Sequence, residues 1–244
     1  MKLSEQDIKT NLQRIANILL LNGGFLNNPG LYTGEMGIVL FFARYARYTQ
    51  NELYLGYAYH LVGKIQYSIH QDTPINYKQG LAGIGSAIEY LVQNGFFEAD
   101  TDEILEDFDR RIFFTYNLPY LPIEEIMDIG YYTSWRLSGN SSQKDRIQTI
   151  VMAQIEKIMH SHFKDPACLQ LNRKIIPAGL KAALYRQCLA QISGNDFSDK
   201  APILQNGLAG WGMSLLTELD GDDSWISLLT NNFTTSNNES LSVS

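Results

Sequence analysis

The sequence predicts an all-α protein built of about five helical hairpins. Three observations support this: apolar residues recur at three- and four-residue steps, strand signals are scarce, and one glycine-led apolar segment returns along the chain. The stretch GLAGIGSAIEYL, starting at Gly80, reappears as GLAGWGMSLLTEL at Gly207, and a rougher copy, GEMGIVLFFARY, starts at Gly34.

The composition indicates how large a domain the chain can form and which class of partner it is unsuited to bind. The chain has 244 residues, of which 45% are hydrophobic, and this suits one large domain. We expect that domain to span residues 1–230 and the polar segment 231–244 to be a loosely ordered tail. A net charge of −7 without a cluster of Lys and Arg argues against nucleic acid as a partner.

The N-terminal segment does not have the pattern of an export signal, because Asp7, Lys9 and Arg14 interrupt its apolar residues. No stretch approaches the ~20 apolar residues of a membrane helix. We therefore expect a cytoplasmic protein with no membrane partner. The two cysteines, Cys168 and Cys188, are too few for a disulfide framework, and we expect each to be a buried thiol.

Four segments have the pattern of amphipathic helices. The first follows Ser4, a candidate N-cap with Asp7 three residues on, and its apolar stripe is Ile8, Leu12, Ile15 and Leu19. The second covers 52–69 with Leu53, Tyr57, Leu61 and Ile65 on its stripe. The third covers 99–114, with Asp100 and Glu103 as a carboxylate capping box before Ile104, Phe108 and Ile112. The fourth covers 141–160 with Ile147, Val151, Ile155 and Ile158.

The glycine-led segments 34–48, 80–92 and 207–219 are apolar or small on most sides, as expected of helices buried between others. Gly34 and Gly80 are 46 residues apart, and Gly130 follows 50 residues later. We interpret Gly130 as a further copy of the glycine opening and Gly179 as a degenerate one.

The glycines of these openings have two interpretations. Without a β-carbon, the first helical turn can approach a neighbouring backbone closely, and we favour this tight fit. Alternatively, the amides of the first turn bind an anion or a peptide carboxylate. The candidate binding glycines are Gly34, Gly37, Gly80, Gly83, Gly207 and Gly210.

Three quoted segments carry a resemblance to a known family. GLYTGEMGIVLFFARYAR, YKQGLAGIGSAIEYLVQNGFFEADTDEILEDFD and LQNGLAGWGMSLLTELDGDDSWISLL resemble the lanthionine synthetase C-like (lanthionine cyclase) family. The resemblance implies an α/α toroid in which such motifs open the inner helices. Because the chain is shorter than the family's usual domain, the toroid is expected to be shortened or incomplete, with the region 140–200 lost or replaced.

The family's cyclases hold a catalytic zinc with two cysteines and a histidine, one cysteine lying in a Cys-His-Gly motif. This chain has no Cys-His-Gly, and no residue can be carried over as a metal ligand. We therefore expect no metal and no cofactor. The alternative is a rearranged zinc site that uses Cys168 and Cys188 with His160 or His162. The other histidines, His60 and His70, fall in or just after an outer-helix pattern.

Two functions remain open. The first is a peptide-binding or accessory protein without zinc, with a peptide substrate or a modification enzyme as its partner. The second is a carbohydrate-active, glycoside hydrolase-like enzyme on the same architecture, with Glu35 and Asp128 as its paired carboxylates. We expect Glu35 to be a first-turn carboxylate favoured by the helix dipole, and Glu89 and Glu218 to be solvated.

Aromatic side chains near the same helix ends are candidates for stacking on a sugar or a peptide side chain, although core packing is the interpretation we favour. They are Tyr32, Tyr131, Tyr132, Trp135 and Trp211. An incomplete ring would leave apolar helix faces exposed. A second subunit could cover these faces, so the chain is also a candidate to form an oligomer.

Overall fold

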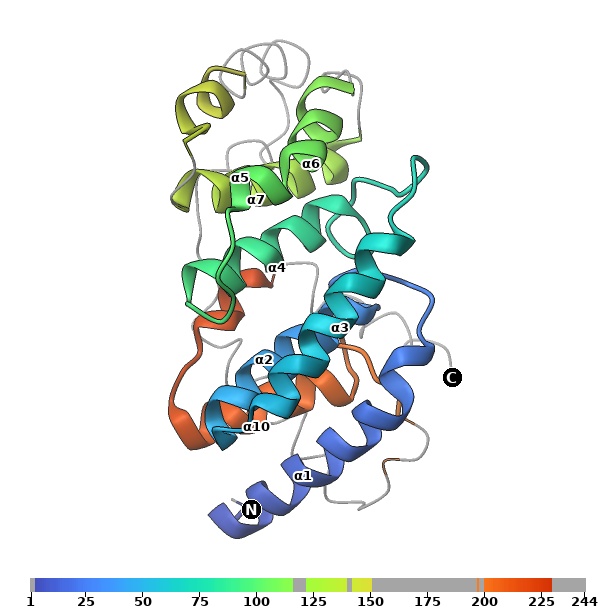
Figure 1. The fold of residues 1–244 in the computed structure, drawn as a ribbon, viewed down its shortest axis with the longest axis vertical. Helices are drawn as coiled ribbons and strands as arrows, with labels where there is room; N and C mark the ends of the chain where they lie inside the picture. Colours follow the sequence, from blue (N-terminus) through green and yellow to red (C-terminus); the bar gives the residue numbers. More distant parts are fainter. Residues whose placement is uncertain (1–2, 116–121, 140–141, 151–196, 198–199, 230–244) are drawn as a thin grey trace, which may run out of the picture. The chain divides into compact units, whose positions relative to one another are not determined.

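The structure, a computed structural model, describes residues 3–115, 122–139, 142–150, 197 and 200–229. These residues form helices and turns without a strand, so the all-α class is confirmed for them (Figure 1). The main helices are α1 (Glu5–Asn22), α2 (Glu35–Thr49), α3 (Glu52–Ser68), α4 (Leu81–Gln93), α7 (Ile123–Ser138) and α10 (Leu208–Asp220). Shorter turns are η1 (Gly23–Phe25), α5 (Thr101–Ile104), α6 (Glu106–Arg110), the π-helical η2 (Arg111–Thr115) and η5 (Ser224–Leu228).

Several predictions concern residues outside this part of the chain. They are the predicted copy at Gly179, the tail 231–244, and the candidate zinc ligands Cys168, Cys188, His160 and His162. Contacts divide the chain into two compact units, one of residues 1–68 with 175–244 and the other of residues 69–174. Among the described helices, none is long and apolar enough to cross a membrane.

Helix α1 begins as its sequence predicts. The Ser4 hydroxyl accepts a hydrogen bond from the Asp7 amide at 3.2 Å, and the Asp7 carboxylate accepts one from the Ser4 amide, which completes a capping box. The predicted apolar stripe, Ile8 to Leu19, is buried. This face packs against α10.

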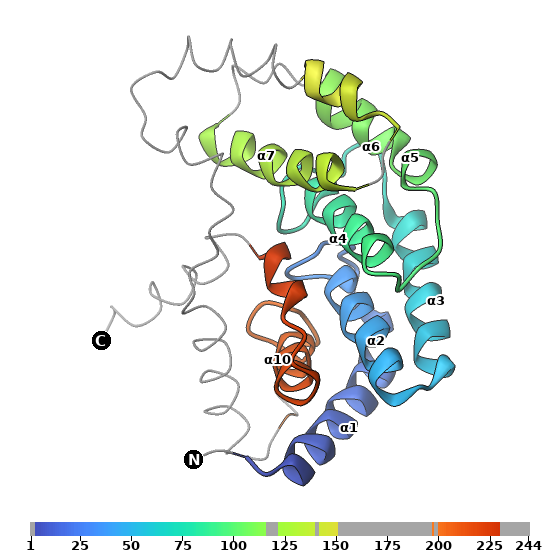
Figure 2. The same ribbon diagram turned by 90° about the vertical axis from the view of Figure 1, so that its left-hand side faces the viewer.

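Helices α2 and α10 lie side by side and parallel in the first unit, although they are far apart in the sequence (Figure 2). Three contacts in order, one with the loop before α10 and two with the helix itself, establish the direction. They are Gly37 with Leu204, the Phe41 ring with Gly212, and Arg44 with Thr217. The first and last glycine-led helices are thus neighbours, a contact that closing a ring of hairpins requires and that is consistent with an α/α toroid.

A buried arginine joins the C-terminal halves of these two helices. Arg44 of α2 donates to both carboxylate oxygens of Asp220, at 3.0 Å each, and to the carbonyl oxygen of Asp222 at 2.7 Å. Its guanidinium also reaches the Thr217 hydroxyl at 3.3 Å. Because its side chain is 1% exposed, these acceptors replace the water that the charge would otherwise bind.

Helix α3 packs on α2, and Figure 1 shows it in front of that helix. Its buried side chains are Ala58, Leu61 and Ile65. The prediction that Leu53 belongs to the buried stripe is wrong, because its side chain is 81% exposed. The next residue, Tyr54, packs against the Phe42 and Tyr45 rings of α2, so the start of the helix does contact α2. Leu53 lies off the buried face because each step of four residues moves about 40° around a helix of 3.6 residues per turn.

The second unit is built around α4 and α7. A β-carbon at Gly85 of α4 would lie within 3.0 Å of the Tyr132 ring of α7, so the glycine permits close packing of the two helices. Residues 144–150 are also helical, and Ile147 is buried as predicted.

Two sequence predictions in this unit need correction. Gly130 does not open a helix, because α7 starts at Ile123 after Pro122 and runs through it. The helix predicted over 99–114 is broken at Leu105 into α5 and α6, and η2 follows. Asp100 does cap α5, by accepting from the amide of Asp102 at 2.9 Å. Phe108 and Ile112 are buried, but the break leaves Ile104 half-exposed.

We predict that Arg44→Met lowers the free energy of unfolding by about 2–3 kcal/mol, because it leaves Asp220 without its buried partner. Urea denaturation measures the change. The control is Lys9→Met, which removes a cation from the exposed pair with Glu5 and should change stability far less, because water screens that pair. Equal costs for the two variants would show that Arg44 does not join α2 to α10.

Candidate functional site

The three glycine-led helices begin with the same hydrogen bond. In each, the amide of the first helical residue donates to the carbonyl of the residue seven positions earlier. The pairs are Glu35 to Asn28 at 2.8 Å, Leu81 to Pro74 at 2.9 Å, and Leu208 to Ala201 at 2.9 Å. A helix N-terminus otherwise leaves such amides to water or a ligand, so the preceding loop occupies one anion-binding group at each end.

The glycines make room for this loop. Gly34, Gly80 and Gly207 have extended backbone angles that any residue adopts, with φ of −137°, −117° and −126°. A β-carbon at any of them would lie within 3.0 Å of the carbonyl oxygen that accepts the amide bond. Steric space, rather than backbone freedom, therefore requires glycine here.

The second glycine of each G-x-x-G motif lies in the first helical turn. A β-carbon at Gly37 would lie within 3.0 Å of the Leu31 carbonyl oxygen and the Leu204 side chain, and one at Gly210 would meet the Leu204 carbonyl oxygen. Gly83 is buried in the first turn of α4. These contacts support the tight-fit interpretation of the motif.

The loops before α2 and α10 are themselves joined, since the amide of Gln205 donates to the carbonyl of Tyr32 at 2.9 Å. The residue just before each opening glycine is polar, and the three residues are Thr33, Gln79 and Asn206. Gln79 and Asn206 are exposed, and Thr33 is half-buried. Each glycine-led end therefore carries a polar side chain on a loop fixed by backbone contacts, and the Thr33 hydroxyl already accepts a hydrogen bond from the Asn28 side-chain amide at 3.1 Å.

Four of the five aromatic candidates lie in the core rather than at an open surface. Tyr32 and Tyr132 are fully buried, while Trp135 and Trp211 are at most 7% exposed. Trp135 packs edge-on against Tyr90, and Trp211 lies beside Phe197. Tyr131 is half-buried against the Tyr77 ring. The burial of the first four supports the packing interpretation.

Glu35, the first residue of α2, is buried and forms an ion pair with Lys64 of α3. The Lys64 ammonium also donates to the carbonyl oxygens of Gly24 at 2.5 Å and Leu26 at 2.9 Å. Burial raises the pKa of Glu35, and the hydrogen bond and charge of Lys64 oppose this rise. Glu35 therefore connects α2 to α3 instead of facing solvent, and Lys64 extends this contact to η1 and Leu26.

Asp128, the other carboxylate candidate, lies on α7 and accepts a hydrogen bond from the Tyr77 amide at 3.0 Å. Tyr77 belongs to the loop before α4, so Asp128 holds that loop against α7. Burial raises the pKa of Asp128 to about 6, although the Tyr77 amide and the charge of Lys78 oppose the rise. Glu35 belongs to the first compact unit and Asp128 to the second.

The prediction that Glu89 is solvated is wrong. Its side chain is 1% exposed and accepts a hydrogen bond from Arg136 at 2.5 Å. The same guanidinium donates to Asp102 and to Asp109, each at 2.8 Å, and the Tyr132 hydroxyl donates to Asp109 at 2.5 Å. Glu218 is half-buried.

Three cations that hold the fold were missed by sequence reasoning: Arg44, Lys64 and Arg136. Two of them carried a signal, because Arg44 and Arg136 occur inside segments that are otherwise mostly apolar. A charge in such a helix must find buried partners.

Within the described residues, no group of three or more His, Cys, Asp or Glu side chains could hold a metal ion. The donor set that zinc requires is therefore not found there.

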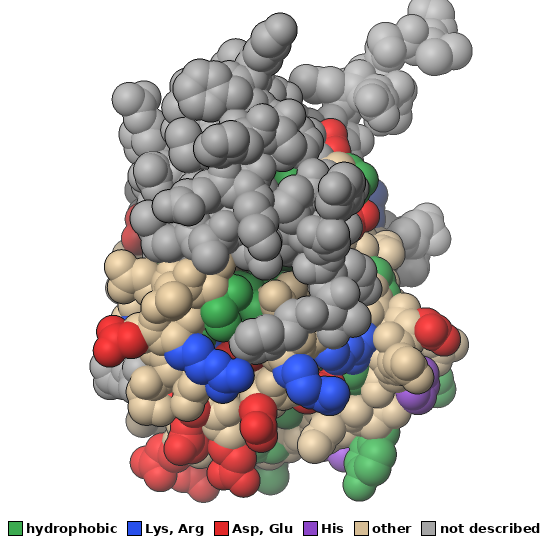
Figure 3. Space-filling view, turned by 90° about the horizontal axis from the view of Figure 1, so that it is seen from above, with side chains coloured by type: hydrophobic (Ala, Val, Ile, Leu, Met, Phe, Trp, Pro, Cys, Tyr) green, Lys and Arg blue, Asp and Glu red, His purple; other side chains and the backbone are tan. Residues whose placement is uncertain are grey.

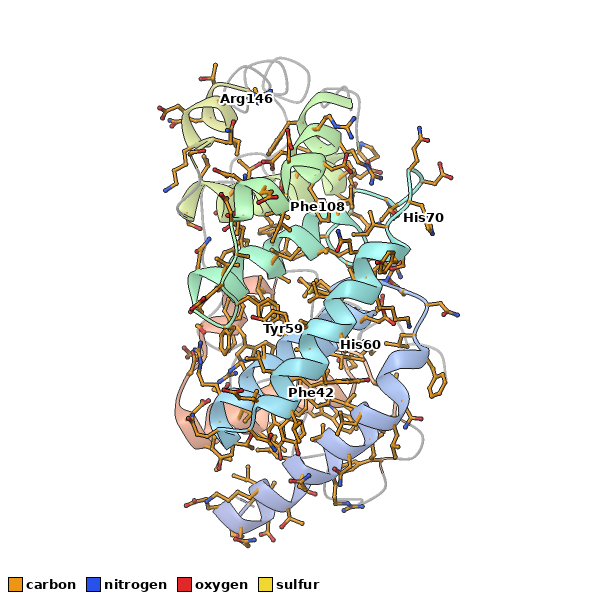
Figure 4. All side chains as sticks on the ribbon, in the orientation of Figure 1. Phe42, Tyr59, His60, His70, Phe108 and Arg146 are labelled. Atoms are coloured by element: carbon orange, nitrogen blue, oxygen red, sulfur yellow. The ribbon has the colours of Figure 1, made fainter. Side chains whose placement is uncertain are left out.

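His60 and His70, labelled in Figure 4, are exposed on α3 and in the segment after it. On the face drawn in Figure 3, acidic and basic side chains appear next to one another among polar ones.

We predict that Gly34→Ala and Gly207→Ala each lower the free energy of unfolding by about 1–3 kcal/mol, because the added methyl group forces the loop carbonyl away. The matched control is Gly24→Ala, whose added carbon would make only an ordinary contact with Tyr57 and which should change stability by less than about 0.5 kcal/mol. Urea titrations of the three variants decide the matter. Variants as stable as the control would contradict the tight fit.

A second prediction concerns the pH dependence of stability. Because the folded pKa of Asp128 is about 6 and its ordinary value is 3.8, the folded protein binds this proton more tightly than the unfolded chain does. Stability should therefore fall as pH rises from 4 to 7. We expect Asp128→Asn, which keeps an acceptor for Tyr77, to reduce that fall by up to about 2 kcal/mol. Urea titrations across this range test it, and parallel profiles would contradict the assignment.

Comparison with known proteins supports the resemblance seen in the glycine motifs. No curated protein and no solved structure matched the chain. A family model did match, over residues 5–116, which contain α1 to α6 and two of the three glycine-led helices. This part of the chain, somewhat less than half of it, is thereby confirmed as similar to the family described as lanthionine synthetase C-like protein.

Proposed function

We propose that this chain is a lanthionine synthetase C-like protein that binds peptides, as a substrate-binding or accessory protein in peptide modification, without zinc-dependent cyclase activity. The match over residues 5–116 supports the family, whose members act on peptide substrates. The observation that carries the proposal further is the repeated architecture of the glycine-led helix ends.

Each glycine-led end combines a fixed backbone with a polar side chain. The loop carbonyl bonded to the first helical amide and the missing β-carbons hold the loop close to the helix. Thr33, Gln79 and Asn206 stand beside these fixed loops. Hydroxyl and amide side chains both donate and accept hydrogen bonds, and therefore suit the alternating groups of a peptide backbone.

In this proposal the candidate binding residues divide into two roles. The glycines Gly34, Gly37, Gly80, Gly83, Gly207 and Gly210 shape the docking ends. The buried rings of Tyr32, Tyr132, Trp135 and Trp211 support the helices behind them. A preformed, polar-edged end of this kind binds with little ordering cost.

Zinc chemistry does not enter the proposal. The described residues offer no ligand group for the metal, and the sequence lacks the Cys-His-Gly motif. The hydrolase alternative is not favoured either. Its candidate acid, Glu35, is buried against Lys64, so it lacks the open position that a carboxylate flanking a glycosidic bond needs.

The test uses the full chain, purified without a histidine tag, and a labelled peptide that carries one cysteine and one dehydroalanine. We expect saturable binding by fluorescence anisotropy, no stoichiometric zinc by elemental analysis, and no loss of the peptide's free thiol. Gln79→Ala should weaken binding about 2- to 10-fold, the loss of one hydrogen bond. Asn206→Gly should do the same, because glycine removes the side chain and tolerates the φ of 58° at this position. Gln6→Ala, at an exposed position on α1, is the control.

Two results would overturn the proposal. Stoichiometric zinc with consumption of the thiol would establish cyclase chemistry, with Cys168 and Cys188 as the first ligands to test. Absence of binding, or binding weakened equally by Gln6→Ala, would show that the glycine-led ends are not a docking site for peptides.

A further inference from the structure

Two glycines of α3, Gly56 and Gly63, differ from four other glycines in the described helices. A β-carbon at Gly37, Gly85, Gly210 or Gly212 would lie within 3.0 Å of a neighbouring atom, so each has a packing reason to be glycine. At Gly56 and Gly63 an added β-carbon would meet nothing within 4 Å among the described residues. Glycine weakens a helix interior relative to alanine, so these two positions carry a cost with no compensating contact inside the described chain.

The position of these glycines on the helix is informative. The buried face of α3 is formed by Ala58, Leu61 and Ile65. Gly56 and Gly63, two helical turns apart, lie on the opposite face and near its centre line. Large exposed side chains lie on the same helix: Leu53 is 81% exposed, Tyr67 is 87% exposed and Tyr59 is 47% exposed. Figure 4 shows Tyr59 and His60 on this helix.

The same face carries little charge, with Glu52 at its start. Between Glu52 and Ser68 the only residue among Asp, Glu, Lys and Arg is Lys64, and its ammonium is bound by Glu35 and two carbonyl oxygens. The chain as a whole has a net charge of −7, which opposes association of two copies and favours an interface where charge is sparse. Two copies that meet through α3 bring no like charges together.

We propose that the face of α3 centred on Gly56 and Gly63 is the interface of a two-fold homodimer, in which the α3 helices of two copies cross closely and antiparallel. A two-fold interface requires a surface that complements itself. This face has that property: about His60 as centre, Leu53 and Tyr67 occupy equivalent distances on either side, and the two glycines flank the centre.

In this dimer the glycines of each helix allow the close approach of the other backbone. Leu53 of one copy packs against the Tyr67 ring of its partner, which buries the two most exposed large side chains of α3. The Tyr67 hydroxyl comes near Glu52 of the other copy, an acceptor at the rim. A second copy therefore fits the gap that the two glycines leave and the low charge of this face.

Sedimentation velocity of the full chain over a range of concentrations tests the proposal. We expect a concentration-dependent dimer, and the double variant Gly56→Leu with Gly63→Leu should raise the dimer dissociation constant by at least about tenfold, because the added side chains fill the crossing. Leu53→Glu with Tyr67→Glu should act similarly through charge. The control Gln6→Leu places the same apolar side chain at an exposed position on α1 and should leave the dimer intact.

The variants also distinguish a failure to fold from a loss of the interface. Because the substituted positions are exposed or open in one copy, circular dichroism and the thermal midpoint of the isolated monomer should be unchanged or higher. A wild-type chain that remains monomeric overturns the proposal. So does a dimer insensitive to both double variants, or a glycine variant that lowers the thermal midpoint of a monomer, which would mean that the chain itself covers this face.

Discussion

The parallel contact between α2 and α10 is the interaction on which the first unit depends. It places the first and last glycine-led helices together, joins their leading loops through Gln205 and Tyr32, and is secured by Arg44 at the other end. Helices α1 and α3 then pack on this pair. The glycines are required because the chain segments cannot otherwise approach so closely. The acceptors at the end of α10 are required because water does not reach the Arg44 guanidinium, which is 1% exposed.

The helices of the second unit are also joined by a buried arginine, but its partners are different. Here one arginine, Arg136, serves three carboxylates, and its Glu89 partner is almost fully buried. Three acids around one base leave local negative charge, which the hydroxyl of Tyr132 and other donors partly compensate. A polar cluster of this kind fixes the positions of α4, α5, α6 and α7 relative to one another, because each hydrogen bond has a defined direction.

Sequence reasoning predicted the helices well where composition and spacing act locally. The Ser4 capping box and the three buried glycine-led helices follow from neighbouring residues. Gly130 was misplaced because a glycine inside a helix and one before it look alike in a sequence. Glu89 was misread because its partner is 47 residues away, and no local pattern connects the two. At the helix ends, the motif identified the glycines but not the loop carbonyls that they accommodate.

The pairing of α2 with α10 also has a consequence for the order of events during synthesis. Helix α2 emerges from the ribosome early, but its partner is made only after the whole of the second unit. At ordinary translation rates this delay is about 10–30 s, far longer than a helix takes to form. During that interval the apolar sides of α1 and α2 that later meet α10 are exposed, while residues 69–174 have time to fold. The nascent chain should therefore depend on chaperones most strongly before residue 208 is made.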